Sequence, residues 1–275
     1  MQKTVFITGS SSGIGKASAK FFAEKGWNVA ASMRNPDKET DLNKLENVKL
    51  YTLDVIDCLS IQKAIAAAIE DFGGIDVVVN NAGYGGVGIF EAAGKEQIQR
   101  QFDTNVFGMM NVIREILPYF RKRKEGCIIN LSSVAGFVCF PSYSIYNASK
   151  FAVEGFTEAL QFELRHFNIR IKNIEPGPIK TDFYARSQDL FHKEGLTDYD
   201  QYARITYSNT QKVGNTAAGP EIVAKKIYQA AMDKTYRLRY PAGIQAIALL
   251  TVKKILPFTW FRAIVKMVVE KGYKA

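Results

Sequence analysis

Short apolar runs bounded by glycine and turn residues alternate with longer amphipathic stretches over residues 1–180. Short runs of this kind predict buried strands, and apolar positions spaced three and four apart predict helices. The predicted strands are 4–8, 28–33, 49–53, 77–80, 127–131 and 170–175, and the predicted helices lie near 13–25, 58–72, 95–121 and 147–167. The alternation predicts an α/β fold whose doubly wound parallel sheet has helices on both faces and binds its ligand at the carboxyl ends of the strands.

The regular alternation fades after Pro176. Residues 182–218 are rich in polar and aromatic side chains, among them Phe183, Tyr184, Phe191, Tyr199, Tyr202 and Tyr207. A long aromatic segment just past a strand end predicts a lid over an apolar substrate, which we place at 183–218. The alternative is a surface excursion whose aromatic side chains pack on the body. Residues 1–275 are then expected to form one domain, with a cofactor-binding and catalytic core over 1–182 and a helical tail over 240–275.

The formal net charge of +9 is concentrated near the C-terminus. From Lys225 to Ala275 there are eleven Lys and Arg residues and two acidic residues, whereas residues 1–224 are balanced, 25 against 25. The core is therefore not uniformly basic, and we expect no nucleic-acid partner. Three irregularly spaced cysteines, Cys58, Cys127 and Cys139, predict neither a disulfide framework nor a metal site. With a strand predicted almost at Met1, no signal peptide is expected and a cytoplasmic location is favoured.

The basic tail contains two apolar segments. Its longest uncharged stretch, 240–252, is too short to span a bilayer of about 30 Å. In the second segment, Arg262, Lys266 and Glu270 form a narrow polar stripe beside a broad apolar face, made of Phe258, Phe261, Ile264, Val265 and Val268. Trp260 and the flanking lysines suit peripheral contact with an anionic membrane. The alternative is that these helices pack over the substrate cleft or on a neighbouring subunit.

A glycine-rich loop, Thr8–Gly15, follows the first predicted strand. Glycines at 9, 13 and 15 allow a tight turn and let backbone N–H groups approach a pyrophosphate at a helix N-terminus. At the end of the second strand, residues 31–35 contain no carboxylate for the ribose hydroxyls of NAD, and Arg34 suits a 2′-phosphate. Hydroxyls of Ser11, Ser12 and Ser32 could add hydrogen-bond donors. The prediction is that NADP(H) is preferred over NAD(H); the alternative is that Arg34 is a solvated strand-end charge.

A tyrosine and a lysine, Tyr146 and Lys150, are four residues apart and so share one face of a helix. An isolated phenol has a pKa of about 10. A nearby ammonium lowers that pKa and makes Tyr146 a usable acid or base. Ser133 lies thirteen residues before Tyr146 and is favoured over Ser132, which points to the other side of the strand. Tyr143 is disfavoured because no lysine follows it four residues on. The pattern predicts hydride transfer with Tyr146 exchanging the proton.

These motifs together resemble the short-chain dehydrogenase/reductase family over residues 3–182. The matching features are the Thr8–Gly15 loop, Asn80-Asn81-Ala82-Gly83, Asn105, Ser133, Tyr146-x-x-x-Lys150 and Pro176-Gly177. The resemblance implies a Rossmann-type fold, a nicotinamide cofactor and a homodimer or homotetramer built on the two long helices. Within the family, the chain looks most like the branch that includes steroid and retinoid dehydrogenases.

The resemblance also implies roles for individual residues. Tyr146 would be the general acid or base, and Lys150 would bind the nicotinamide ribose and lower the tyrosine pKa. Ser133 would hydrogen-bond the substrate carbonyl, and Asn105 would hold a water that links Lys150 to solvent. Asp54 would contact the adenine. The other cofactor-binding positions would be Gly9, Ser11, Ser12, Gly13, Ile14, Gly15, Arg34, Val55, Asn81, Ala82, Gly83, Pro176, Gly177, Ile179 and Thr181.

The apolar segment 136–141, between Ser133 and Tyr146, must pass close to the reacting centre. Together with the aromatic segment it predicts a hydrophobic ketone or secondary alcohol as substrate. The predicted function is an NADP(H)-dependent oxidoreductase for such a substrate. The alternative is a non-catalytic redox sensor that binds NADP(H) and acts through a protein partner, a role that does not require the complete proton-transfer set.

Overall fold

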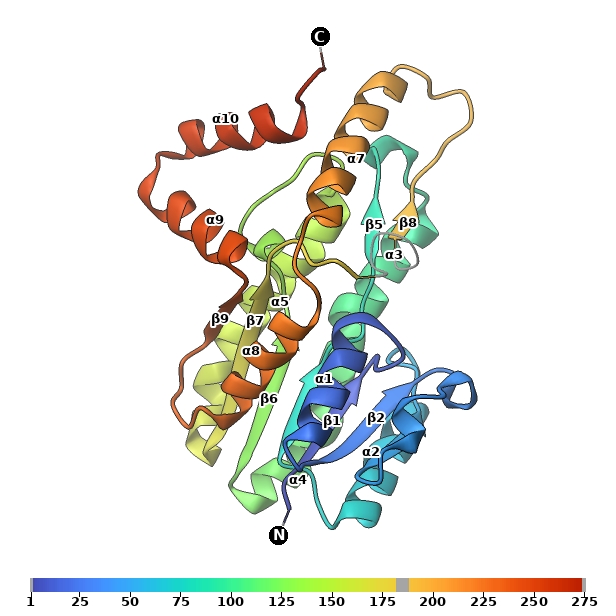
Figure 1. Cartoon of the computed structure of the whole chain (residues 1–275), viewed down its shortest axis with the longest axis vertical. Coiled ribbons are helices and arrows are strands. Elements are labelled where there is room, and N and C mark those ends of the chain that lie inside the picture. Colours follow the sequence, from blue (N-terminus) through green and yellow to red (C-terminus); the bar gives the residue numbers. More distant parts are fainter. Residues whose placement is uncertain (1, 182–187, 274–275) are drawn as a thin grey trace.

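The computed structural model describes residues 2–181 and 188–273, apart from the side chain at position 215. Its centre is a sheet of seven parallel strands in the order β3-β2-β1-β4-β6-β7-β9 (Figure 1). The strands are β1 (Thr4–Thr8), β2 (Asn28–Met33), β3 (Val48–Thr52), β4 (Val77–Asn80), β6 (Gly126–Leu131), β7 (Ile169–Pro176) and β9 (Arg239–Ala242). The strand order reverses between β1 and β4, where an α/β sheet forms a crevice for a ligand.

Helices cover both faces of this sheet. One face is covered by α1 (Gly13–Glu24) and α8 (Glu221–Met232), and the other by α2 (Cys58–Phe72), α4 (Met109–Arg123) and α5 (Ser144–Leu164). The remaining helices are α3 (Lys95–Phe102), α7 (Asp200–Asn215), α9 (Ile244–Ile255) and α10 (Phe258–Val269). Alternation along β1 sends Ile7 to a core shared with α1 and α8, and Phe6 to a core shared with α2, α4 and α5. The predicted doubly wound α/β fold with C-terminal helices is confirmed.

The predicted strands form within one residue of their expected limits, but the long helix expected over 95–121 is interrupted. Between α3 and α4 the chain makes a π-helix over Asp103–Gly108. The wider turn accompanies a close approach of Gly108 to Val55, where an added Cβ would lie 2.7 Å from a methyl group. π-Helical turns of this kind are frequent at functional sites.

The segment after Pro176 is more regular than its sequence suggested. It contains β8 (Gln188–Leu190), which pairs in parallel with β5 (Gly85–Val87), followed by α7. Phe191 is buried against the glycines of β5, and the Tyr202 hydroxyl donates to Glu270 at 3.0 Å. These two aromatic side chains therefore pack on the body, as the alternative interpretation expected. Phe183 and Tyr184 lie outside the described residues.

The tail helices α9 and α10 are partly packed and partly exposed. Phe261, Val265 and Val269 of α10 are buried in a small core with Val138, so one side of this helix is fixed to the body. The opposite side of α10 and much of α9 face solvent. Among the described residues, no helix is both long enough and apolar enough to cross a membrane.

Candidate active site

A cleft of about 810 Å³ lies at the carboxyl ends of the strands, at the place where the strand order reverses. Its walls come from the loops that follow β1, β4, β6 and β7, from the first turns of α5, and from α7 and α10. All the predicted site residues line this cleft except Gly15 and Asn105. The tertiary structure thus brings together motifs that are up to 170 residues apart in the chain.

The glycine-rich loop forms a close-fitting turn ahead of α1. Gly9 has a φ of +70°, and a Cβ there would lie 2.9 Å from the Ala82 Cα. A Cβ on Gly15 would overlap the Gly9 carbonyl oxygen and the Asn81 amide. Asn81 Nδ2 donates to the carbonyl oxygens of Thr8 and Gly9, at 2.9 and 3.0 Å, and so holds the loop in place. Gly15 therefore lies behind the cleft wall, where its lack of a side chain lets the loop and Asn81 pack closely.

The start of α1 faces the cleft and is suited to an anion. Ser12 occupies the N-cap position, but its side chain does not cap the helix. The first backbone N–H groups of a helix carry partial positive charge and bind phosphate when no side chain satisfies them. With the three glycines leaving room for close approach, these residues fit the pyrophosphate of a dinucleotide.

The far end of the cleft contains the residues expected near the adenosine. Arg34 is exposed at the end of β2 and lines the cleft, as does Asp54 after β3. The Asp54 carboxylate accepts from the Ile56 N–H at 3.2 Å. Ser32, considered as a donor to the cofactor, is fully buried and donates to the Ile7 carbonyl at 3.0 Å. Arg34 therefore lines the cleft, whereas Ser32 does not.

Tyr146 and Lys150 share the first turns of α5 and both line the cleft. Lys150 is 8% exposed, and its Nζ donates to the Leu131 carbonyl at 2.7 Å. The same ammonium lies 5.7 Å from the centre of the Tyr146 ring. Burial lowers the pKa of Lys150 to about 8, against a smaller opposing effect of Glu154. The predicted lysine–tyrosine pair is thus assembled in a largely dry setting.

Two hydroxyl-bearing side chains stand beside this pair. Ser133 follows β6; its Oγ accepts from the Ala135 N–H at 3.1 Å and donates to the Pro176 carbonyl at 3.5 Å. The long second contact leaves that hydrogen free to turn toward a substrate oxygen. Tyr143, weighed only as a rival to Tyr146, also lines the cleft, with its ring edge-on to Tyr146 at 6.2 Å. Its hydroxyl accepts from Gln188 at 3.2 Å.

Asn105 lies in the π-helix, behind the cleft wall. Its Oδ1 accepts from the Tyr84 N–H at 3.0 Å, and its Nδ2 donates to the Tyr84 carbonyl at 2.8 Å. Its side-chain amide therefore positions Tyr84, which lines the cleft. The predicted role of Asn105 in holding a water for Lys150 stays a prediction.

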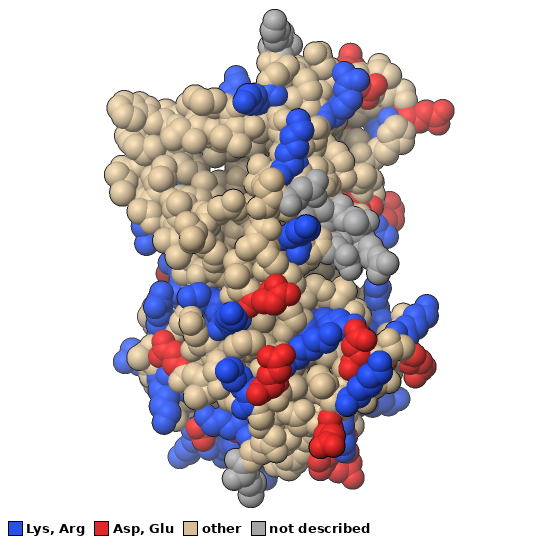
Figure 2. All heavy atoms as spheres, viewed as in Figure 1, with Lys and Arg blue, Asp and Glu red and all other residues tan. Residues whose placement is uncertain are grey.

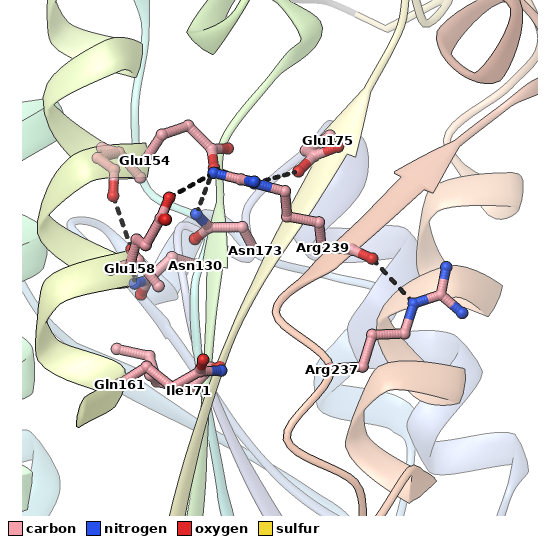
Figure 3. Close-up of polar contacts among 11 residues, drawn as sticks. Asn130, Glu154, Glu158, Gln161, Ile171, Asn173, Glu175, Arg237 and Arg239 are labelled. Carbon is pink, nitrogen blue, oxygen red and sulfur yellow. Dashed lines mark hydrogen bonds and ion pairs between the residues drawn. The ribbon is translucent and has the colours of Figure 1, made fainter. Parts of the chain in front are cut away.

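A buried acidic cluster, Glu154 and Glu175 with Arg239, was not foreseen from the sequence (Figure 3). Glu154, one turn after Lys150 on α5, accepts from Asn173 Nδ2 at 2.8 Å and lies 3.5 Å from the Arg239 Nε. Glu175, at the end of β7, lies 3.7 Å from the same Nε. Burial raises the pKa of Glu154, and burial together with repulsion by Glu154 raises the pKa of Glu175 to about 8. The only sequence signal was the four-residue spacing from Lys150.

The cleft is closed by residues for which the sequence contained no motif. Asn209, Thr210 and Val213 of α7 contribute to one side, and Val268 and Val269 of α10 contribute beside them. The Asn209 amide donates to the Val269 carbonyl at 3.0 Å and so ties the two helices together. Only tertiary packing brings these segments to the catalytic end of the sheet.

The fold and the site together define a Rossmann-type, dinucleotide-binding protein. Residues 3–190 match the family model described as short chain dehydrogenase. An uncharacterized oxidoreductase of Bacillus subtilis, YusZ, is 36% identical over 96% of this chain and 98% of its own length. A 3-ketodihydrosphingosine reductase of Bacteroides thetaiotaomicron is 39% identical over 65% of each chain. The protein belongs to the short-chain dehydrogenase family and is an NAD(P)-dependent oxidoreductase.

Solved structures of family members share this fold. A short-chain dehydrogenase from Streptomyces avermitilis gives a TM-score of 0.83 at 29% identity, covering 96% of this chain and 95% of the other. A short chain dehydrogenase/reductase from Burkholderia phymatum in complex with NAD gives 0.80 at 26% identity, covering 92% and 93%. ElxO with NADP bound gives 0.73 at 28% identity, covering 89% and 99%. Similar folds thus bind either dinucleotide.

Proposed function

We propose that this protein is an NADP(H)-dependent oxidoreductase that interconverts an apolar ketone and its secondary alcohol, with Tyr146 as the acid or base. The observation that carries the proposal is the placement of the buried Lys150 ammonium, 5.7 Å from the Tyr146 ring in the wall of the cleft. A cation held there favours the phenolate and so eases proton loss from the tyrosine.

The chain's own residues account for the proton transfer. When bound, the nicotinamide cofactor supplies or accepts the hydride. In the direction of reduction, the Ser133 hydroxyl donates a hydrogen bond to the substrate oxygen as negative charge develops there. Tyr146 then protonates that oxygen, and Lys150 stabilises the phenolate left behind. A water held at Asn105 is the proposed route by which the proton is replaced from solvent.

The preference for NADP(H) over NAD(H) rests on Arg34. The glycine-rich loop and the start of α1 would hold the pyrophosphate of either dinucleotide. Arg34 lines the cleft at the end of β2, where NAD-binding proteins place an acidic residue. Its exposed guanidinium suits a 2′-phosphate. Equal affinities for NADPH and NADH in a fluorescence titration would contradict the preference.

The apolar nature of the proposed substrate is supported by apolar residues in the cleft wall. They include Val134, Ala135 and Phe140, which lie between Ser133 and Tyr146 in the chain, and Val213 and Val268 from α7 and α10. The described part of the expected lid over 183–218 contributes α7 to this wall. A sphingoid ketone, named for one relative, and the steroid and retinoid substrates implied by the sequence resemblance all belong to this apolar class.

We also propose that the protein forms a homodimer or homotetramer and that its tail contacts a membrane surface. Phe151 and Phe162 of α5 are 43% and 71% exposed, which suits burial against a second copy. Light scattering on the protein and on Phe162→Glu tests this assembly. If the parent protein and Phe162→Glu both have the mass of a monomer, the proposed assembly is contradicted.

The test of the enzymatic function is loss of NADPH absorbance with a panel of apolar ketones, and its gain with the matching alcohols and NADP. Tyr146→Phe should abolish turnover while NADPH still binds. Tyr143→Phe, which removes a hydroxyl from the same wall but away from Lys150, should lose far less. If NADPH binds and no substrate turns over in either direction, the proposal fails, and the alternative of a redox sensor acting through a partner is favoured.

A further inference from the structure

Exposed apolar side chains of the described chain are concentrated on α9 and α10. Nine of its nineteen large exposed hydrophobic side chains fall between residues 244 and 268. We call this set the tail face; it consists of Ile244, Ile247, Val252, Ile255, Phe258, Trp260, Ile264, Met267 and Val268. Figure 2 shows the α9–α10 region, at the upper left, as a broad area without charged side chains, with basic side chains along its margins. A cluster of exposed apolar side chains of this kind indicates an interaction site.

The tail face is fixed in position rather than free to fold back on the body. Phe261 and Val265 on the inner side of α10 are already buried with Val138. Trp260, Ile264 and Met267, spaced four and three residues apart, form one outward strip that is 40% to 71% exposed. Helix α10 therefore has two apolar surfaces: an inner one that packs on the body, and an outer one that is exposed to solvent.

The charges around the tail face select its partner. From residue 244 to 273 the chain has five cationic side chains, Lys253, Lys254, Arg262, Lys266 and Lys271, and a single carboxylate. That carboxylate, Glu270, accepts from Tyr202 and lies 3.9 Å from Lys266. A second copy of the same face would bring like charges together, whereas an anionic lipid surface complements them. Trp260 and Phe258 are the aromatic side chains that interfacial helices insert at the headgroup level.

The tail face also adjoins the catalytic cleft. Val268 is 52% exposed on α10 and lines the cleft, and its neighbour Val269 lines it from the inner side. The rim of the cleft and the edge of the tail face are therefore the same turn of helix. A surface that covers the tail face lies directly against the mouth of the cleft.

We propose that the tail face docks this protein on an anionic bilayer with the mouth of the cleft against the lipid, so that the substrate is a membrane-dissolved lipid ketone that reaches the cleft alongside α10. The nature of the substrate rests on the enzymatic function proposed above, whereas the docking specifies the membrane contact proposed there and does not depend on the enzymatic activity. A long-chain ketone could then enter from the bilayer without its chain crossing water, which would cost free energy in proportion to its apolar area.

Vesicle binding tests the docking independently of catalysis. The full-length protein should cosediment at low salt with vesicles of equal parts phosphatidylserine and phosphatidylcholine, and much less with phosphatidylcholine alone. Trp260→Ser/Met267→Ser should weaken this binding by about tenfold or more, because both apolar anchors are lost. Leu59→Ser, which removes a 66% exposed apolar side chain on α2, is the matched control and should bind normally.

The two tryptophans provide a second readout that needs no variant. Brominated lipids should quench the fluorescence of Trp260, which is 66% exposed. They should leave the fluorescence of Trp27 unchanged, because that side chain is 5% exposed in the core. Absence of both cosedimentation and quenching overturns the docking. If Trp260→Ser/Met267→Ser instead converts a dimer to a monomer and the parent protein ignores vesicles, a second copy covers the tail face and the proposal is wrong.

Turnover separates this inference from the proposed function. Trp260→Ser/Met267→Ser should reduce a water-soluble ketone at the rate of the parent protein but lose most of its activity on a long-chain ketone in vesicles. Equal loss with both substrates, or none with either, overturns delivery from the bilayer. Failure of the parent protein to reduce any ketone, with vesicle binding intact, contradicts the enzymatic proposal and the lipid substrate while the docking stands.

Discussion

Replacing Glu175 with glutamine should remove a large pH dependence from the stability of this protein. Glu175 is 1% exposed and shares one side chain, Arg239, with the equally buried Glu154. Burial, followed by repulsion from Glu154, raises the pKa of Glu175 from 4.5 to about 8, while Arg239, Lys254 and Arg237 oppose the shift. The folded protein therefore keeps a proton near neutral pH that the unfolded chain releases.

The sign and the size of the effect follow from this difference in pKa. Between pH 4.5 and 8 the folded state binds more protons than the unfolded state, so the free energy of unfolding falls as the pH rises. The displacement from 4.5 to about 8 corresponds to about 5 kcal/mol at most, since each pKa unit is about 1.4 kcal/mol. Arg239 is 42% exposed, and solvent there weakens the electrostatic effects on the cluster. At most about 3.5 kcal/mol of this is lost between pH 5 and 8, and we expect an observed change of about 2–3 kcal/mol over that range.

Urea denaturation of the apo protein at several pH values between 5 and 8 measures the effect. Glu175→Gln mimics the protonated carboxyl, so its stability should be close to that of the parent protein at pH 5 and exceed it by about 2–3 kcal/mol at pH 8. Glu158→Gln removes a 54% exposed partner of Arg239 and should keep the parent's slope. A Glu175→Gln protein whose stability still falls by the full amount between pH 5 and 8 would refute the reasoning.

Three further predictions concern the cleft. Because burial lowers the pKa of Lys150 to about 8, kcat/KM for ketone reduction should fall as the pH rises through that value, and a pH profile that climbs to pH 10 would contradict this. Gly15→Ala should abolish NADPH binding and destabilise the fold by about 1–3 kcal/mol, because the methyl group meets the Asn81 amide. Gly155→Ala, with nothing within 4 Å, is its control and should leave NADPH fluorescence titrations unchanged. Arg34→Ala should weaken NADPH binding by about tenfold, because one exposed charged contact is lost, and should leave the affinity for NADH unchanged. Equal effects on the two affinities would exclude a role for Arg34 at the 2′-phosphate.

Much of the fold and the reaction centre could be predicted because local sequence carries their signals. Strands such as Thr4–Thr8 are short, largely apolar runs buried on both sides, and in this case Gly9 follows directly after the strand. The Tyr146 and Lys150 pair depends only on the helical repeat, which is the same in every helix. Gly9 and Gly15 occupy positions where any side chain would collide with the loop or with Asn81, so their identity alone indicates the turn.

Other features depend on contacts between segments that local patterns do not specify. The π-helix around Asn105 forms where the chain meets Tyr84 and Val55, and no repeat in its sequence indicates it. The predicted apolar face of α10 is divided by packing, which buries Phe261 with Val138 and leaves Phe258 and Ile264 exposed.

By itself, the sequence determined the main strands and helices of residues 1–180, the glycine-rich loop and the spacing of the proposed acid–base pair, because each depends on residues close together in the chain. Only the tertiary structure decided what surrounds that pair. Glu154 and Glu175 share Arg239 because β7 and β9 are neighbours in the sheet, although 64 residues separate Glu175 from Arg239. The burial that shifts their pKa values, like the α7 and α10 wall of the cleft, arises from packing of distant segments and has no local counterpart in the sequence.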